Sequence, residues 1–233
     1  MRLFFFLLIT INANPEVAAE YPPTRRVDHV DTYHGVEVAD PYRWLEGDVR
    51  ESAEVADWVE SQSEYARRYL DAIPARKVFA RRLEALYDYE RYSTPLQKAG
   101  RYFFRKNDGL QDQSVLYVAN SPSDDGRVLL DPNTWSDDGT VALSNYSVSD
   151  DGQLIAFAKS SAGSDWKTIH VMEIETGKMH EDVLEWVRFG GIEWEKQSRG
   201  FYYSRYPEPE EGEQFQSLAL NQAAYYHKLG DKQ

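Results

Sequence analysis

The hydrophobic pattern of the chain changes after Tyr89, from helical spacing to short runs of aromatic and β-branched residues. These runs are separated by turn-forming clusters that end in glycine, such as Asn107-Asp108-Gly109 and Asp150-Asp151-Gly152. Short strands joined by tight turns are typical of antiparallel β architectures. We therefore expect strands at residues 101–105, 114–118, 154–158, 168–174 and 200–204.

A weak internal repeat narrows the choice of architecture. Residues 148–157 resemble residues 192–203, and Gly152 and Gly200 lie 48 positions apart. That spacing fits one blade of a β-propeller, a unit that needs neighbouring blades to bury its faces. The sequence therefore predicts a mostly β fold with N-terminal helices and about two to three propeller blades. The acidic run 207–213 interrupts this pattern, so we expect an exposed loop there.

Two amphipathic helices are expected ahead of the strands. Residues 50–73 carry apolar side chains at i, i+3 and i+4 spacing, and Pro74 ends this run. A second helix is expected over residues 75–88, because proline is tolerated in the first turn of a helix. We expect this helical segment to pack on a body outside the chain.

A dense motif precedes the helices. Asp40-Pro41-Tyr42-Arg43-Trp44-Leu45-Glu46 follows Tyr33-His34-Gly35. Pro41 forces the chain to turn, Trp44 and Leu45 supply an apolar anchor, and Arg43 and Glu46 are free to pair. Because the motif holds neither a nucleophile nor a set of metal ligands, its residues alone favour a segment that docks onto a larger body.

The same motif resembles the opening of the prolyl oligopeptidase family of serine peptidases. The resemblance runs in collinear order over about residues 21 to 233, through the segments 86–89, 110–118, 130–133, 136–143, 163–166 and 225–230. It implies an α/β-hydrolase domain capped by a seven-bladed β-propeller, in an enzyme that cuts short peptides after proline. The family's catalytic serine, aspartate and histidine would lie in the hydrolase domain, beyond the propeller.

The chain shows none of that catalytic machinery. It has no G-x-S-x-G elbow and no His-Gly-Gly loop, and Gly163-Ser164-Asp165-Trp166 lacks the second glycine of such an elbow. We therefore expect no catalytic residue here and no peptidase activity from the chain alone. The expected organisation is a signal peptide at 1–19, a helical segment associated with the hydrolase domain at 20–89, and an incomplete propeller at 90–233.

Two functional hypotheses follow. In the first, the chain is the N-terminal fragment of a prolyl oligopeptidase-like serine endopeptidase whose propeller gates access for short peptides. Its partners would be proline-containing peptides and its own C-terminal hydrolase domain, in an enzyme that is a monomer when intact. In the second, the chain is a non-catalytic β-propeller binding module. An open arc of blades argues against the second, because it leaves strand edges and apolar faces uncovered.

The resemblance assigns two substrate-binding residues. Phe189 matches a propeller phenylalanine that lines the non-prime side of the substrate pocket, where its ring can pack on the residue before the scissile proline unit. The alternative is a core phenylalanine on a strand. Asp165, in a loop beside Trp166, is expected to contact or steer a peptide amine, with a turn-capping aspartate as the alternative.

Composition excludes several classes of partner and cofactor. The net charge of −13 disfavours nucleic acid, and the absence of cysteine removes disulfides and thiolate chemistry. The five histidines are scattered without metal-ligand spacing, so we expect structural histidines, no metal and no cofactor. Asn145-Tyr146-Ser147 is an N-glycosylation sequon, which matters only in a eukaryotic secretory route.

The N-terminus has the order of a secretory signal. Arg2 precedes the apolar run 3–11, and Val17-Ala18-Ala19 suits a signal peptidase. The run is too short for a helix that spans a bilayer, so we expect an exported protein, periplasmic or secreted, without a membrane anchor. The alternative is a wrongly assigned start codon and a cytoplasmic protein.

Overall fold

The computed structural model describes residues 21–210 and 220–233. The expected signal peptide therefore lies outside the described residues, as does part of the acidic run after Glu210. The chain divides into two compact units, residues 1–83 and 84–233, and each is described by itself.

The first unit opens with a short hairpin of β1 (Val30–Tyr33) and β2 (Val36–Ala39). Both residues of its turn have positive φ, 52° at His34 and 84° at Gly35, which is the geometry that a two-residue type I′ turn requires. Tyr33 and Val36 pair directly across the turn. His34 thus lies in a turn, as the sequence predicts.

Arg43 holds the motif that follows the hairpin. It lies in the short 3-10 helix η1 (Arg43–Glu46) and pairs with Asp31 of β1. It also contacts Asp40 at 3.1 Å and Glu46 at 2.7 Å, so the predicted Arg43–Glu46 pair is confirmed. One guanidinium therefore joins the hairpin, the turn after Pro41 and η1.

Trp44 is the apolar anchor of the same motif. Its indole N–H donates to the carbonyl of Arg25 at 2.9 Å, and its ring meets Trp58 edge-on, with centroids 6.4 Å apart. Because Trp58 lies on α1 (Ala53–Asp71), these contacts fix the start of that helix against the motif.

The two helices form at the expected places. α1 begins after Ser52, whose hydroxyl accepts from the backbone N–H of Val55, and α2 spans Arg76–Tyr87. Val55 is the buried residue of α1, and α2 has none, with Phe79 67% exposed. The apolar faces that the sequence shows are thus largely uncovered in the described residues. None of the helices in the described part of the chain is both long and apolar enough to cross a membrane.

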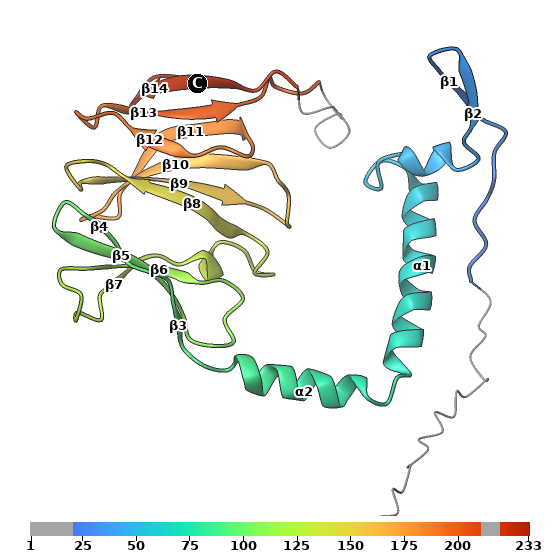
Figure 1. Cartoon of the computed structure of the whole chain (residues 1–233), viewed down its shortest axis with the longest axis horizontal. Coiled ribbons are helices and arrows are strands. Elements are labelled where there is room, and N and C mark those ends of the chain that lie inside the picture. The colour runs from blue at the N-terminus through green and yellow to red at the C-terminus, as the bar shows by residue number, and fades with distance from the viewer. Residues whose placement is uncertain (1–20, 211–219) are drawn as a thin grey trace, which may run out of the picture. The chain divides into compact units, whose positions relative to one another are not determined.

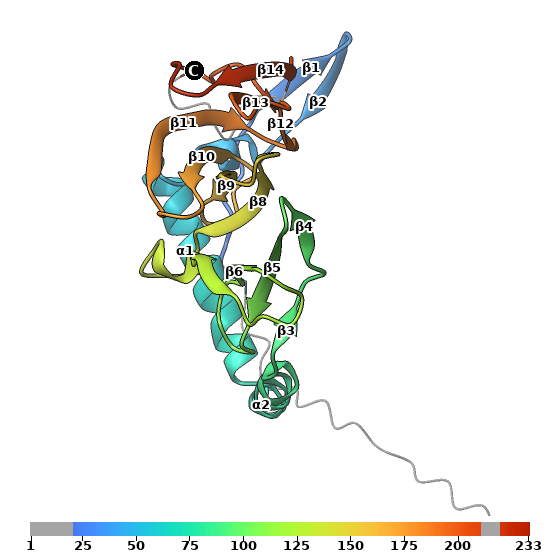
Figure 2. The same cartoon turned by 90° about the vertical axis from the view of Figure 1, so that its left-hand side faces the viewer.

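The second unit consists of three antiparallel sheets that follow one another along the chain (Figures 1 and 2). The first has the order β3-β5-β6-β7, with β4 also paired to β5. Its strands are β3 (Arg91–Tyr92), β4 (Leu96–Lys98), β5 (Arg101–Asn107), β6 (Val115–Ala119) and β7 (Arg127–Leu130).

The second and third sheets continue the same meander. The short helix η2 (Pro132–Thr134) leads to β8 (Ala142–Val148), β9 (Leu154–Ser160), β10 (Lys167–Glu173) and β11 (Met179–Val187). The third sheet contains β12 (Ile192–Trp194), β13 (Gly200–Arg205) and β14 (Ala223–Lys228). A five-stranded sheet, a four-stranded sheet and a three-stranded sheet make a partial β-propeller, so the predicted fold class is confirmed.

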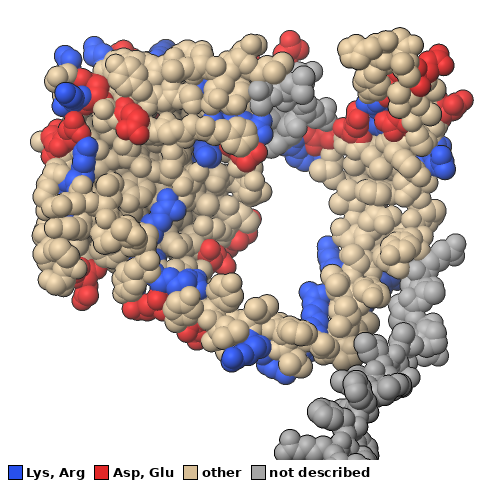
Figure 3. Space-filling view, in the orientation of Figure 1, with Lys and Arg blue, Asp and Glu red and all other residues tan. Residues whose placement is uncertain are grey.

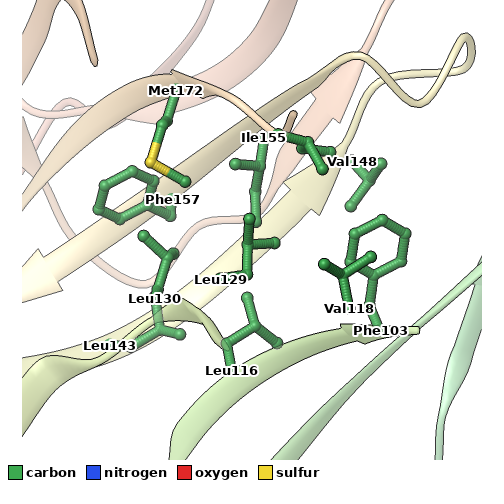
Figure 4. Packing of buried hydrophobic residues seen from close by; sticks show 11 residues of the cluster. Phe103, Leu116, Val118, Leu129, Leu130, Leu143, Val148, Ile155, Phe157 and Met172 are labelled. Carbon is green, nitrogen blue, oxygen red and sulfur yellow. The ribbon is translucent and has the colours of Figure 1, made fainter. Parts of the chain in front are cut away.

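Apolar side chains fill the two seams between successive sheets. In the first seam, Phe103 and Leu116 of the first sheet face Ile155 and Phe157 of the second (Figure 4). In the second seam, Ala156, Ala158, Ile169 and Val171 of the second sheet meet Ile192, Phe201 and Tyr203 of the third. The alternation along β9 explains both seams, because successive residues of a strand point to opposite faces.

The internal repeat corresponds to two matching hairpins, shifted by two residues from the glycine alignment. Val148 pairs with Ile155 in one hairpin, and Trp194 pairs with Phe201 in the other. The counterpart of Gly152 (φ 70°) is therefore Ser198 (φ 58°). Gly200 lies inside β13 for another reason: a Cβ there would lie 2.2 Å from the carbonyl oxygen of His227.

Candidate functional site

A bulge in β11 shapes the most developed site of the second unit. Lys167 pairs with Val187 and Ile169 pairs with Leu184, so two residues of β11, Glu185 and Trp186, lie opposite one residue of β10. Trp186 takes a left-handed backbone with φ 58°. Bulges of this kind redirect a side chain out of the regular alternation of a strand.

The loop between β9 and β10 forms the other side of the site. Ser164 donates its N–H to the carbonyl of Ser161 at 2.9 Å, and its hydroxyl accepts from the N–H of Trp166 at 3.1 Å. These bonds place Trp166 edge-on to Trp186, with ring centroids 5.7 Å apart. Trp166 also meets Tyr206 edge-on at 5.9 Å.

Arg188 lies at the centre of the aromatic cluster. Its guanidinium carbon is 4.7 Å from the ring centroid of Trp166 and 4.9 Å from that of Phe189. Its Nη2 donates to Oδ2 of Asp165 at 3.1 Å, and its carbonyl accepts from Gln222 at 3.0 Å. Arg188 therefore connects the two residues that the family resemblance assigns to substrate.

Phe189 is not a core phenylalanine. It follows the end of β11, has φ 48° and is 62% exposed. The alternative of a buried strand position is therefore wrong. Turn capping in the 161–166 loop falls to Ser164, while the carboxylate of Asp165 accepts from Arg188. Substrate contact by Phe189 and Asp165 stays a prediction.

A cavity of about 650 Å³ opens between the loop and the bulge. Trp166 and Trp186 are among its walls, and Phe189 is not. Its charged lining residues are Lys159, Lys167, Arg188, Asp165 and Glu185. The cavity is large enough for one or two side chains of a bound peptide, since small-molecule sites begin near 300 Å³.

Lys159 and His170 are the two ionisable groups near the cavity whose pKa values burial lowers. The amine of Lys159 lies 4.4 Å from the ring centroid of Trp135, and burial lowers the pKa of this amine. Burial, with the nearby Lys159 charge, lowers the pKa of His170 to about 4. His170 is therefore neutral at pH 7, which leaves the lysine as the cation.

Two histidines of this unit contact a hydroxyl or a carboxylate, but neither contact belongs to a catalytic triad. Thr168 and His170 are in contact at 3.0 Å between Oγ1 and Nε2, as neighbours on β10. Asp182 and His227 form a separate buried pair at 2.7 Å between β11 and β14. Nucleophile, base and orienting acid must meet in one chain of contacts, and the described residues do not supply it. They also contain no group of three or more potential metal ligands.

The sequon asparagine is engaged in the fold. Asn145 lies half-buried in β8 and donates its side-chain amide to the carbonyl of Gly190 at 3.3 Å. An acceptor asparagine must present its amide to solvent.

Figure 3 shows positive and negative side chains interspersed over the visible face of the sheet unit, without a basic stripe for nucleic acid.

Sequence reasoning missed Arg188, Lys159, Lys167 and Trp186. Arg188 and Trp186 lie within three positions of Phe189, so that proximity was the available signal for these two. The lysines come from β9 and β10, where polar residues at strand ends are ordinary. The sequence pattern does not predict that these two lysines line the same cavity.

The chain is similar in sequence to one known family of proteins. Residues 22–233 match the family model of the prolyl oligopeptidase N-terminal β-propeller domain. The chain belongs to the prolyl oligopeptidase family. The prolyl endopeptidase of Elizabethkingia meningoseptica is 39% identical over 228 residues, which cover 98% of this chain and 32% of that protein. The dual-function macrocyclase-peptidase POPB of Galerina marginata is 36% identical over 240 residues, covering 91% and 32%.

Solved structures of the family agree. A prolyl endopeptidase structure matches with a TM-score of 0.80 and 36% identity, over 91% of this chain and 31% of that one. Prolyl oligopeptidase B from Galerina marginata, bound to a 35mer hydrolysis and macrocyclization substrate, matches with a TM-score of 0.77 and 36% identity, over 92% and 33%. The chain thus spans about a third of the length of the relatives it matches.

Proposed function

We propose that the chain is the propeller-bearing N-terminal part of a serine endopeptidase that cleaves short peptides after proline. In the whole enzyme, a hydrolase domain would supply the serine nucleophile, the histidine base and the oxyanion hole. The propeller would admit short peptides and exclude folded proteins. The observation that carries the proposal is the match to a prolyl endopeptidase over 98% of the chain.

The proposed role of the site described above is to hold the peptide on the side N-terminal to the cleaved bond. Phe189 offers an exposed ring, one face of which already rests against Arg188. The other face would pack on the residue before the prolyl unit. Asp165 is 57% exposed at its side chain while paired with Arg188, and its remaining oxygen would meet a peptide amine.

A proline-specific fluorogenic peptide tests the assignment of chemistry. The 233-residue chain alone is expected to show no turnover above a buffer blank, because it lacks the serine elbow. The chain fused to the hydrolase domain encoded downstream is expected to cleave after proline. Turnover by the chain alone, or a downstream frame without a serine elbow followed by aspartate and histidine, would contradict the proposal. A non-catalytic binding module would instead bind peptide without any such partner domain.

We further propose that the protein is exported and cleaved close to Ala19. The apolar run 3–11 stands in front of a body with many charges, and exposed on a cytosolic protein it would favour aggregation. N-terminal sequencing of the natural protein is expected to begin at Glu20 or Tyr21. Recovery of soluble protein that retains Met1 would refute export.

A further inference from the structure

We propose that Trp166 and Trp186 form a second aromatic contact for the peptide and bind one of its aromatic side chains in the cavity between the 161–166 loop and the β11 bulge. The inference rests on the proposed function, and it extends recognition of the peptide beyond Phe189. It predicts a preference for peptides that carry a second aromatic residue, farther than the first from the cleaved bond.

Two aromatic residues near the cavity have an unusual backbone. Trp186 has φ 58° and Phe189 has φ 48°, a left-handed conformation that bulky residues rarely adopt. Such a conformation lowers stability, persists only where surrounding contacts hold it, and is most frequent at functional sites. Two such aromatic residues within four positions therefore indicate that this segment presents its rings to a ligand.

Contacts from the third sheet hold the segment in place. The N–H of Tyr206, which follows β13, donates to the carbonyl of Trp186 at 3.0 Å. The side-chain amide of Gln222 donates to the carbonyl of Arg188 and to the hydroxyl of Ser204, both at 3.0 Å. The aromatic walls are thus positioned before any ligand enters, which lowers the entropic cost of binding.

The charged side chains around the cavity do not give it a preference for one sign of charge. Arg188 and Asp165 form an ion pair at 3.1 Å. Lys159 and Lys167 point to opposite faces of the sheet in the β9–β10 register, and Lys159 lies on the face of the first seam. Lys167 and Glu185, which also line the cavity, carry opposite charges. The two indoles are therefore the groups that select a ligand there.

Trp166 and Trp186 form a corner that suits an aromatic ring. Both are half-buried and line the cavity, and their ring planes meet at 87° with centroids 5.7 Å apart. A ring that lies flat on one indole meets the other edge-on, and these are the two arrangements that aromatic pairs prefer. An aliphatic side chain in the same corner would gain only the burial of its apolar area.

The separation from Phe189 sets the spacing of the two aromatic residues in the peptide. The guanidinium carbon of Arg188 is 4.7 Å from the ring centroid of Trp166 and 4.9 Å from that of Phe189, so these two centroids are at most 9.6 Å apart, the sum of both distances. Two residues of an extended peptide span about 7 Å, and their side chains point to the same side. We therefore expect the second aromatic residue two positions before the one that packs on Phe189.

Three synthetic peptides test this preference. They share a core with phenylalanine before the prolyl unit, and they carry phenylalanine, leucine or alanine two positions ahead of that phenylalanine. Isothermal titration of the full chain is expected to show about tenfold tighter binding of the phenylalanine peptide than of the alanine peptide, with the leucine peptide between them.

Two substitutions at position 186 locate the effect. Trp186→Gly removes the indole, and glycine adopts φ 58° without strain, so the bulge keeps its backbone. It is expected to lower the phenylalanine-to-alanine affinity ratio from about ten to about one without changing the affinity for the alanine peptide. Trp186→Phe keeps an aromatic wall and is expected to retain most of the ratio.

Tyr202→Ala is the matched control. It removes a ring that is 55% exposed on β13 and does not line the cavity, so the ratio should stay at the wild-type value. Circular dichroism melting curves verify that each variant is folded.

The outcomes are distinguishable. Equal affinity of the wild-type chain for all three peptides would overturn the inference and leave the contact at Phe189 intact. Equal affinity for the phenylalanine and leucine peptides would overturn the aromatic corner, since burial alone would then explain the gain. An equal fall in affinity for every peptide in Trp186→Gly would make Trp186 a structural residue and overturn its role in selection. Failure of every peptide to bind would overturn the proposed peptide site itself, and the inference with it.

Discussion

Gly152 is the position where the seam between the first two sheets can be tested most cleanly. It has φ 70°, and a Cβ built there would lie 2.5 Å from the Cβ of Ala99 in the β4–β5 turn. Gly177, in the β10–β11 turn, has nearly the same φ, 71°, but nothing lies within 4 Å of its Cβ position. An alanine would take the same unfavourable left-handed backbone at either position, and only at position 152 would it also meet a close contact.

The expected costs follow from that difference. Gly177→Ala should destabilise the protein by about 1 to 2 kcal/mol, the cost of a left-handed backbone for an L-residue. Gly152→Ala should add about 1 to 3 kcal/mol for overpacking against Ala99. The double variant Gly152→Ala with Ala99→Gly removes the clash, and glycine tolerates the φ of 48° at position 99. Because Ala99→Gly also relieves the left-handed backbone at position 99, the double variant should be at least as stable as Gly177→Ala, and the coupling energy of the mutant cycle isolates the clash.

Urea unfolding followed by far-ultraviolet circular dichroism measures these differences, provided that the slope with denaturant stays constant. The coupling energy between positions 99 and 152 comes from the double-mutant cycle. Equal destabilisation by Gly152→Ala and Gly177→Ala would refute the close approach of the two turns. A double variant no more stable than Gly152→Ala would refute the assignment of the clash to Ala99.

Two further predictions concern buried ionisable groups. Asp182→Ala should destabilise the protein by about 3 to 5 kcal/mol in the same urea assay, because it leaves the His227 imidazole and the Gly230 N–H, both 2.7 Å from its carboxylate, without a partner. The control Asp165→Ala, at an exposed carboxylate, should cost about 1 kcal/mol or less. Similar values for the two variants would contradict the buried pair. For His170, the folded pKa of about 4 lies below the unfolded value of 6.5, so the unfolded chain takes up the proton first and stability falls as pH drops from 6.5 toward 4. His170→Gln should flatten the stability profile in that window by about 1 kcal/mol after allowance for solvent screening, and an unchanged slope would contradict the burial of the imidazole.

The sequence predicts those elements whose apolar residues recur with the period of a strand or a helix. Strands at 101–105, 154–158, 168–174 and 200–204 are confirmed as β5, β9, β10 and β13, because aromatic and β-branched residues fill both seams there. The helices at 50–73 and 75–88 appear as α1 and α2 within a few residues. Hydrophobic periodicity reports the strands because burial in the seams gives them their pattern, and it reports the helices through an apolar face that the described residues leave largely uncovered.

The strand β11 was not among the expected strands, because a buried polar residue inverts its pattern. In β11, Asp182 is 7% exposed while Val183 is 44% exposed. In β14, His227 is 4% exposed, whereas Tyr226 is 45% exposed. The carboxylate and the imidazole satisfy each other at 2.7 Å, so burial costs little for the pair although each residue alone would be unfavourable. A partner 45 residues away is invisible to any local window.

The candidate site shows the same limit more strongly. Phe189 and Asp165 were found through family resemblance, while Arg188, the residue that joins them, is next to Phe189 in sequence but carries no motif that marks its role. Its position depends on one extra residue in β11, which shifts the register between Leu184 and Val187 and turns Trp186 toward the cavity. The spacing of the buried positions in β11 changes from two, between Asp182 and Leu184, to three, between Leu184 and Val187, and the sequence does not tell that break from an ordinary strand end. Because Trp186 and Arg188 reach the cavity through that shift, removing one residue from the bulge should disperse the cavity while leaving both seams intact. The site is therefore a consequence of strand register, and register is set by the whole sheet rather than by the residues that line the cavity.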